Sequence, residues 1–314
     1  MITILYFGTP SFSANLLDNL IKSELDVKIS GIVTQPDKPV GRKKILTPSP
    51  VKIYAQKYEI PVFENSEHAK AAIENADLCI VYAYGNFISQ ETLDLPRYGF
   101  WNIHPSLLPK YRGATPMTFP LLLATTTTGV SLMKMDHLMD HGPIIAQEPY
   151  KLSAETTRLD LEDKLTQIGS DLLITSLRRL IEEGLSLSNF VEQDHVEKSV
   201  SLLLKKDDGF VSEEILKMAL SSISSKKFDL PPIYLRYQEK NPEEILPLFT
   251  PAEIIWNMYR ALTPWPGVWT IIDNKRMKLL DLEYREKKII LKTVQTEGKN
   301  PTPFSPGLPV IDLL

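Results

Sequence analysis

The stretch ADLCIVYAY, residues 76–84, decides the fold of this sequence. It is apolar almost without interruption, which is typical of a strand that is covered on both faces. Shorter apolar runs occur at ITILYF (2–7), VKISGIV (27–33) and FWNIH (100–104), with helical patterns between several of them. Strands that alternate with helices predict an α/β, Rossmann-like domain with a mostly parallel sheet.

The remaining elements of this α/β domain complete the sheet, and the domain lacks the sequence pattern of a dinucleotide-binding site. TGVSLMKM (128–135) and PIIAQEPYKL (143–152) read as an antiparallel pair, and residues 156–183 are strongly helical. The first strand is followed by GTPSFS (8–13) and not by the G-x-G-x-x-G pattern that cradles a dinucleotide. A nicotinamide-dependent dehydrogenase is therefore the weakest of the functions considered.

The sequence changes character after about residue 205. KKDDGF (205–210) reads as a turn-rich junction, residues 213–226 as a helix, and the proline-rich residues 229–249 as a connector. A helix is predicted at 250–262, because Thr250 can cap it and Glu253 completes a capping box.

Short strands follow at 270–273, 277–284 and 288–294, joined by tight turns, and they predict a small OB-like β-barrel. We expect three parts: a Rossmann-like domain at 1–204, a junction and insertion at 205–249, and the OB-like domain at 250–314.

Composition limits the classes of function. The 314 residues carry a net charge of −4, which disfavours a protein coated with nucleic acid and leaves room only for local contacts. No run of about 18 apolar residues predicts a membrane span. The single cysteine, Cys79, cannot form an internal disulfide and fits a reducing cytoplasm. No cluster of cysteine and histidine has zinc spacing, so no metal is predicted.

NIHPSLLPKYRG, residues 102–113, is the first stretch that could carry chemistry. Asn102 and His104 have the same parity on a strand, so both side chains point to one face. Pro105 keeps His104 extended. The pair would emerge at the carboxyl end of a strand, where sheets of this type hold their sites. The alternative is a hydrogen-bonded strand end that only fastens a loop.

HLMDHGPII, residues 137–145, supplies a carboxylate, Asp140, in a loop between two strands. Such a carboxylate can orient an imidazole, although Asp before Gly-Pro also commonly completes a turn. With His104 as proton carrier and Asn102 as oxyanion donor, the three residues suit acyl transfer. Ser106 does not lie in a nucleophile elbow, so the nucleophile is expected to belong to the substrate, most simply an amine.

The basic stretch TQPDKPVGRKKILTPSPVK, residues 34–52, reads as a flexible loop that could grip phosphates or simply be solvated. Tyr111, Arg112 and Gly113 could shape a pocket wall or start a helix.

Taken together, these strings, with YAYGNFIS (82–89) and LTPWPGVWT (262–270), resemble the methionyl-tRNA formyltransferases over nearly the whole chain. The NIHPSLLPKYRG and D-x-G-P strings are shared by the wider folate-dependent formyltransferases. The PSPVK string with its basic loop, and the domain opened by PWPG, resemble the transfer-RNA branch.

The resemblance implies formyl transfer from 10-formyltetrahydrofolate to the α-amine of initiator methionyl-tRNA. We expect a cytoplasmic monomer without a metal. The implied catalytic residues are Asn102, His104 and Asp140. The implied tRNA contacts are Arg42, Lys43 and Lys44. The implied folate-binding residues are Ala83, Tyr84, Gly85, Phe87, Ile88, Ser106, Leu107, Leu108 and Pro109.

The sequence departs from the family pattern at residues 214–248, which lengthen the connection between the domains and could add a helix, a tether or an RNA contact. Two other functions stay open. One is formylation of an amino sugar nucleotide by the same three catalytic residues, and the other is a non-catalytic folate- or RNA-binding paralogue.

Overall fold

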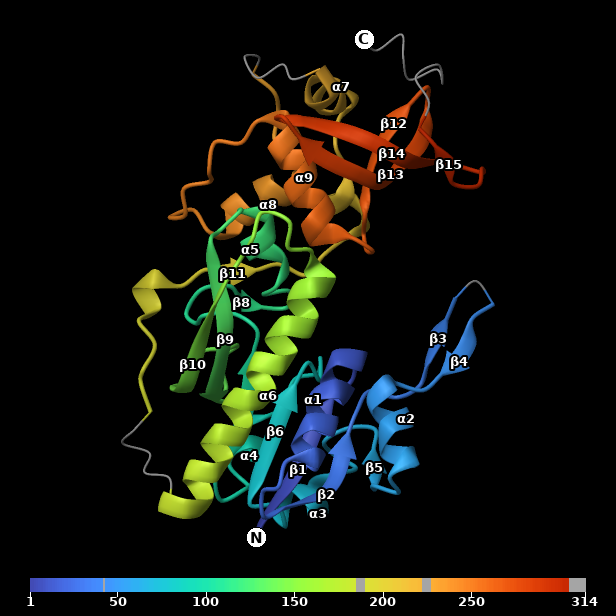
Figure 1. Cartoon of the computed structure of the whole chain (residues 1–314). Helices are drawn as coiled ribbons and strands as arrows, with labels where there is room; N and C mark the ends of the chain where they lie inside the picture. Colours follow the sequence, from blue (N-terminus) through green and yellow to red (C-terminus); the bar gives the residue numbers. More distant parts are fainter. Residues whose placement is uncertain (42, 185–189, 222–226, 305–314) are drawn as a thin grey trace. The chain divides into compact units, whose positions relative to one another are not determined.

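A computed structural model of the protein describes residues 1–41, 43–184, 190–221 and 227–304 (Figure 1). The chain forms two compact units, and each is assembled from three separate stretches. The first unit holds residues 1–116, 127–151 and 162–198, and the second holds residues 117–126, 152–161 and 199–314. The three-part division expected from the sequence stays a prediction.

A seven-stranded sheet forms the centre of the first unit (Figure 1). Its strands are β1 (Ile2–Gly8), β2 (Val27–Val33), β5 (Val62–Phe63), β6 (Leu78–Tyr82), β7 (Phe100–His104), β9 (Thr127–Lys134) and β10 (Ile144–Lys151). They lie in the order β10-β9-β7-β6-β1-β2-β5. From β7 to β5 neighbouring strands are parallel, whereas β9 is antiparallel to both β7 and β10. The predicted mostly parallel, Rossmann-like sheet and the antiparallel pair at its end are confirmed.

Helices cover both faces of this sheet (Figure 1). They are α1 (Ser11–Lys22), α2 (Pro50–Lys57), α3 (Lys70–Glu74), α4 (Gln90–Leu93) and the long α6 (Arg158–Glu183). On one face, α1 and α6 are joined by a hydrogen bond from Asn19 Nδ2 to Ser170 Oγ (3.0 Å). On the other face, α3 and α4 contribute buried side chains to a cluster with β6 and β7. All five residues of β6 are buried, as its apolar sequence predicts.

Alternation along β7 decides which side chains share a face. Phe100 packs in the cluster with Ile73 and Leu93, on the side of α3 and α4. Ile103 lies on the opposite face, against Gly169 of α6. Asn102 and His104 have the parity of Phe100, so the predicted common face is confirmed.

The basic stretch forms a β-hairpin and not the loop that its composition suggested. Strands β3 (Lys38–Val40) and β4 (Ile45–Thr47) pair antiparallel, and the hairpin extends away from the sheet (Figure 1). Val40 lies opposite Ile45, a pair of β-branched residues that favours strands. Gly41 and Lys44 take positive φ values of 73° and 49°, which the tight connection requires.

The second unit contains a four-stranded antiparallel sheet, which confirms the predicted small β unit at the carboxyl end of the chain. Its strands, in order, are β12 (Val268–Ile272), β13 (Lys275–Arg285), β14 (Lys288–Thr296) and β15 (Thr302–Pro303). Asp273 and Asn274 have positive φ values of 50° and 58°, as in the two-residue turns that match the twist of hairpins.

The shorter elements of the chain are α5 (Thr118–Leu122), α7 (Glu213–Ser221), α8 (Pro232–Lys240), β8 (Arg112–Gly113), β11 (Val200–Ser201), η2 (His195–Glu197) and η3 (Lys206–Gly209).

Helix α9 (Pro251–Leu262) packs beneath this sheet and begins as its sequence predicts. The Glu253 N–H donates to Thr250 Oγ1 (3.3 Å), and the Thr250 N–H donates to Glu253 Oε2 (2.8 Å). The capping box is therefore confirmed.

The expected connector at 229–249 contains helix α8, so that expectation was wrong. Its prolines do not break the helix, because Pro231 is the N-cap and Pro232 takes the first turn, where no amide donor is needed. The Tyr237 ring stacks on Phe119 at 4.8 Å, and Tyr234 donates to the Leu122 carbonyl at 3.0 Å. The part of the insertion that the structure describes is thus packed into the second unit; the end of the predicted 213–226 helix, residues 222–226, lies outside the described residues.

No helix within the described ranges combines the length and the apolar character needed to cross a membrane.

The contact between α6 and β7 leaves no room for a side chain at Gly169. A Cβ placed there would lie 2.9 Å from the Ile103 Cγ2 methyl, which belongs to a stiff, β-branched side chain. We expect Gly169→Val to lower the free energy of unfolding by about 1–3 kcal/mol through overpacking. Urea denaturation would measure the loss. Gln167→Val, at an exposed position of the same helix, is the control, and equal effects of the two substitutions would contradict the packing argument.

Candidate active site

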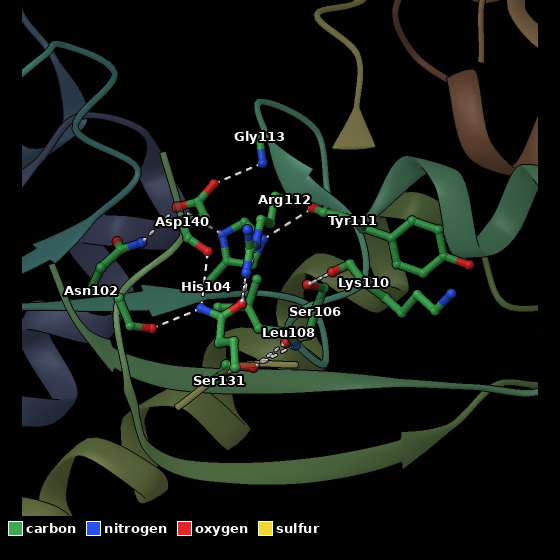
Figure 2. Close-up of polar contacts among 12 residues, drawn as sticks. Asn102, His104, Ser106, Leu108, Lys110, Tyr111, Arg112, Gly113, Ser131 and Asp140 are labelled. Carbon is green, nitrogen blue, oxygen red and sulfur yellow. Dashed lines mark hydrogen bonds and ion pairs between the residues drawn. The ribbon is translucent and has the colours of Figure 1, made fainter. Parts of the chain in front are cut away.

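Three polar side chains meet at the carboxyl end of β7 (Figure 2). Asn102 Nδ2 lies 3.4 Å from Asp140 Oδ1, and His104 Nδ1 lies 3.6 Å from the same oxygen. His104 is buried and Asp140 is half-buried. The structure thus brings together the three residues predicted to be catalytic, with one carboxylate oxygen facing both the amide and the imidazole.

The backbone of Asp140 holds an uncommon conformation. Its φ is +49°, in the left-handed region that Asp and Asn adopt more readily than other side chains. The second carboxylate oxygen, Oδ2, accepts the Gly113 N–H at 2.7 Å. A carboxylate that accepts this bond through Oδ2 keeps Oδ1 directed to Asn102 and His104.

The other ring nitrogen of His104 fixes the tautomer. Nε2 lies 3.1 Å from the Tyr111 carbonyl oxygen, which can only accept a hydrogen bond. Nε2 must therefore carry a proton, and in the neutral ring Nδ1 is the free base. The nitrogen that can take up a proton is the one that faces Asp140.

The next loop, residues 106–110, is fastened to β9 by one hydroxyl group (Figure 2). Ser131 Oγ donates to the Ser106 carbonyl at 2.6 Å and accepts the Leu108 N–H at 2.9 Å. Gln147 Nε2 donates both to Ser131 Oγ and to the Leu108 carbonyl, each at 2.8 Å. Ser106 and Leu108 are buried, whereas Leu107 and Pro109 are half-buried. The four residues predicted to bind folate here form one fixed loop beside β7.

The second predicted folate segment, residues 83–88, leaves the sheet beside the first. Val81 pairs with Asn102 across β6 and β7, so this loop begins at the same edge of the sheet. Ala83, Gly85 and Phe87 are exposed, and Phe87 is 79% exposed. By contrast, Tyr84 and Ile88 are buried in the core, so their side chains support the loop.

The predicted tRNA contacts lie at the tip of the β3–β4 hairpin. Lys43 and Lys44 are exposed there, whereas Arg42 lies outside the described residues.

Sequence reasoning did not find Ser131, Gln147 and Gln193 as parts of this region. Gln193 Nε2 donates to the carbonyls of Asp140 and Gly142, at 3.0 and 2.8 Å. Each of the three is a single polar residue far in sequence from the loop it supports, and no local motif marks it. Arg112, which was noted only as a possible pocket wall, is buried and bonded to Gln193.

The side chains of Asn102, His104 and Asp140 can stabilise a negative charge and move a proton at one place, beside Asp140 Oδ1. The Asn102 amide can donate to a developing oxyanion, and His104 Nδ1 can exchange a proton next to a carboxylate. The described residues contain no group of three or more His, Cys, Asp or Glu side chains placed to hold a metal ion.

Comparison with protein families matches two segments of the chain. The model described as "Formyl transferase" matches residues 1–177, and the model described as "Formyl transferase, C-terminal domain" matches residues 243–300. The sheet, the strand-end site and these matches define a formyl transferase.

The chain is 34% identical to methionyl-tRNA formyltransferase of Caldicellulosiruptor saccharolyticus, over 89% of this chain and 79% of the relative. It is 32% identical to the enzyme of the same name from Staphylococcus aureus strain JH1, over 91% and 81%. The chain therefore belongs to the methionyl-tRNA formyltransferase family.

A solved structure with a related fold is the N-formyltransferase of Helicobacter canadensis, in complex with folinic acid and dTDP-3-aminofucose. The two chains superpose with a TM-score of 0.58 at 17% identity, over 94% of each chain. At this identity the likeness concerns the fold.

Removing the Ser131 hydroxyl would leave a buried amide without a partner. We expect Ser131→Ala to lower the free energy of unfolding by about 1–3 kcal/mol, because the Leu108 N–H loses its acceptor. Urea denaturation would measure the change. Ser176→Ala is the matched control, because this buried hydroxyl only adds a bond to the helical carbonyl of Leu172. A loss no larger than that of the control would refute the role given to Ser131.

Proposed function

We propose that this protein transfers the formyl group of 10-formyltetrahydrofolate to the α-amine of initiator methionyl-tRNA, and so supports the start of translation. Membership of the family and the names of the curated relatives support this reaction. The observation that carries it is the shared contact of Asn102 and His104 with one oxygen of Asp140.

The proposed reaction needs no nucleophile from the protein. The neutral methionyl amine attacks the formyl carbon, a carbon–nitrogen bond forms, and the carbonyl oxygen becomes an oxyanion that accepts a hydrogen bond from Asn102. The bond from that carbon to N10 of the folate then breaks. One proton leaves the attacking amine and one is gained by N10, so the reaction is balanced.

His104 is the residue proposed to carry this proton. Because Nε2 is already committed to the Tyr111 carbonyl, the proton moves on and off Nδ1. The adjacent Asp140 carboxylate stabilises the imidazolium that forms. A placed acid or base of this kind usually contributes about a hundred- to ten-thousandfold in rate.

The folate is proposed to bind between the two loops that flank β7. Exposed Ala83, Gly85 and Phe87 and the partly exposed Leu107 and Pro109 would contact it, while Tyr84, Ile88, Ser106 and Leu108 would shape the loops. The related fold solved with folinic acid supports a folate derivative as the donor.

The acceptor is proposed to reach the protein through the β3–β4 hairpin. Lys43 and Lys44 are exposed, and exposed lysines can pair with phosphates. Arg42 is proposed to act with them from the sequence alone. The single cysteine, which is buried, fits work in a reducing cytoplasm, and a monomer is proposed.

Formylation of an amino sugar nucleotide is the second candidate, favoured by the fold of the Helicobacter canadensis enzyme. It would keep the three catalytic residues and dispense with the basic hairpin. A binding protein without activity is the third candidate, and the intact catalytic set argues against it.

The deciding assay offers 10-formyltetrahydrofolate with two acceptors, charged initiator methionyl-tRNA and an aminodeoxy sugar nucleotide. We expect turnover only with the tRNA, and a fall of about a hundred- to thousandfold in kcat for Asn102→Ala, because one oxyanion donor is lost. Asn75→Ala, at an exposed helix end, is the control. Turnover only with the sugar would overturn the proposed acceptor. Full activity of Asn102→Ala would remove its oxyanion role.

The hairpin proposal has a separate readout. We expect the double substitution of Lys43 and Lys44 by Ala to raise KM for tRNA roughly tenfold and to reduce its dependence on salt, with KM for the folate unchanged. Replacing exposed Lys70 and Lys164 by Ala changes the net charge equally and is the control. If both pairs weaken tRNA binding alike, the effect is one of net charge and the hairpin has no special contact.

A further inference from the structure

A short segment after α6 lies along the loop that carries Asp140. Val191 and Ile144 exchange two main-chain hydrogen bonds, of 2.8 and 2.9 Å, at the start of β10. Two residues later, Gln193 donates to the carbonyls of Asp140 and Gly142. Its side chain is only 4% exposed, so both bonds are made away from water.

Arg112 fixes which way the Gln193 amide points. Its Nε and Nη2 both donate to Gln193 Oε1, at 3.1 and 2.5 Å. Because a guanidinium can only donate, Oε1 must face Arg112 and Nε2 must face the two carbonyls. Burial lowers the pKa of Arg112, and the carboxylates of Asp140 and Asp136 oppose that shift. Nη2 also lies 2.8 Å from His195 Nδ1, which must accept this bond.

These contacts close a ring around Asp140. The Gly113 N–H holds its carboxylate directly, while the neighbouring residue, Arg112, holds its carbonyl through Gln193. The ring therefore fixes both the side chain and the main chain of Asp140. Such contacts suit a residue with φ of +49°, because a non-glycine residue persists in that conformation only when its surroundings impose it.

We propose that Gln193 and Arg112 are positioning residues for the reaction, which hold Asp140 so that one oxygen serves both His104 and Asn102. Neither touches the reacting atoms. The inference rests on the proposed function for its kinetic consequence, and on the ring of contacts for its geometry. Without the pair, the Asp140 loop would sample other conformations, and its carboxylate would leave the imidazole and the amide unsupported.

Two substitutions of Gln193 separate positioning from simple burial. Gln193→Glu keeps an acceptor for Arg112 and loses both donors to the loop, whereas Gln193→Met loses all these bonds at similar volume. We expect both variants to lower kcat about ten- to a hundredfold, as misplacement of a catalytic group by about 1 Å does, with KM for either substrate changed less than about twofold. Full activity of Gln193→Glu would overturn the inference. It would mean that the hydrogen bonds from Gln193 to the Asp140 loop do not matter, and that Arg112 needs only a hydrogen-bond acceptor.

A double-substitution cycle asks whether Gln193 acts through Asp140. Since Asp140→Asn already removes the charge, adding Gln193→Met should slow kcat no further. Independent, multiplicative losses would overturn the inference. The control is Asn241→Leu, which removes another buried amide that donates to two carbonyls, those of Val200 and Tyr237, each at 3.0 Å. We expect it to affect stability and to leave kcat of the folded protein near that of the wild type.

Hydrogen exchange of the free proteins keeps the test independent of any substrate. We expect amides of residues 136–144 to exchange roughly tenfold faster in Gln193→Met and at the wild-type rate in Asn241→Leu. Unchanged exchange in Gln193→Met would overturn the positioning role. A wild-type protein that formylates no tRNA would instead refute the proposed function, and the exchange result would still decide whether Gln193 holds the loop.

Discussion

The site depends on the division of contacts between the two oxygens of the Asp140 carboxylate. Asp140 Oδ2 is occupied by the Gly113 N–H, so Oδ1 is left for Asn102 and His104. This division requires the left-handed backbone at Asp140 and one strand, β7, that holds the amide and the imidazole on the same face. The sheet, its edge pair β9 and β10, and the loop between them serve that requirement.

In the proposed reaction the protein contributes position and charge, and its substrates bring the reacting atoms. His104 illustrates the point, because one ring nitrogen is fixed by the Tyr111 carbonyl and the other is the one proposed to take up the proton. Asn102 is an amide that cannot itself titrate, and it can only donate or accept hydrogen bonds. The proposed chemistry therefore depends on keeping three side chains in register, and the polar contacts of Ser131, Gln147 and Gln193 hold the loops around them.

The parts of the fold that could be predicted are those governed by local rules. Parity along residues 100–104 placed Asn102 and His104 on one face, and the capping box at Thr250 located the start of α9, because both depend on neighbouring residues alone. Helix α8 was missed because its prolines were read as breakers, although they occupy its first turn. Gln193 lies more than fifty residues from Asp140 in sequence, and only tertiary packing brings it to that carbonyl. The types and spacing of Asn102, His104 and Asp140 suggested their catalytic roles, whereas the substrates entered through resemblance to a family.

The chain alternates between its two units, and this limits how such a protein can evolve by exchanging modules. The family matches suggest two modules in series, at 1–177 and 243–300. Yet the chain passes between the units near residues 116, 126, 151, 161 and 198. A recombination event that exchanged the carboxyl-terminal module would leave behind residues 117–126 and 152–161, on which that module packs, as Arg260 does on Leu121 and Trp256 on Ala154. Inheritance as a single block is the expected history of a chain interleaved in this way.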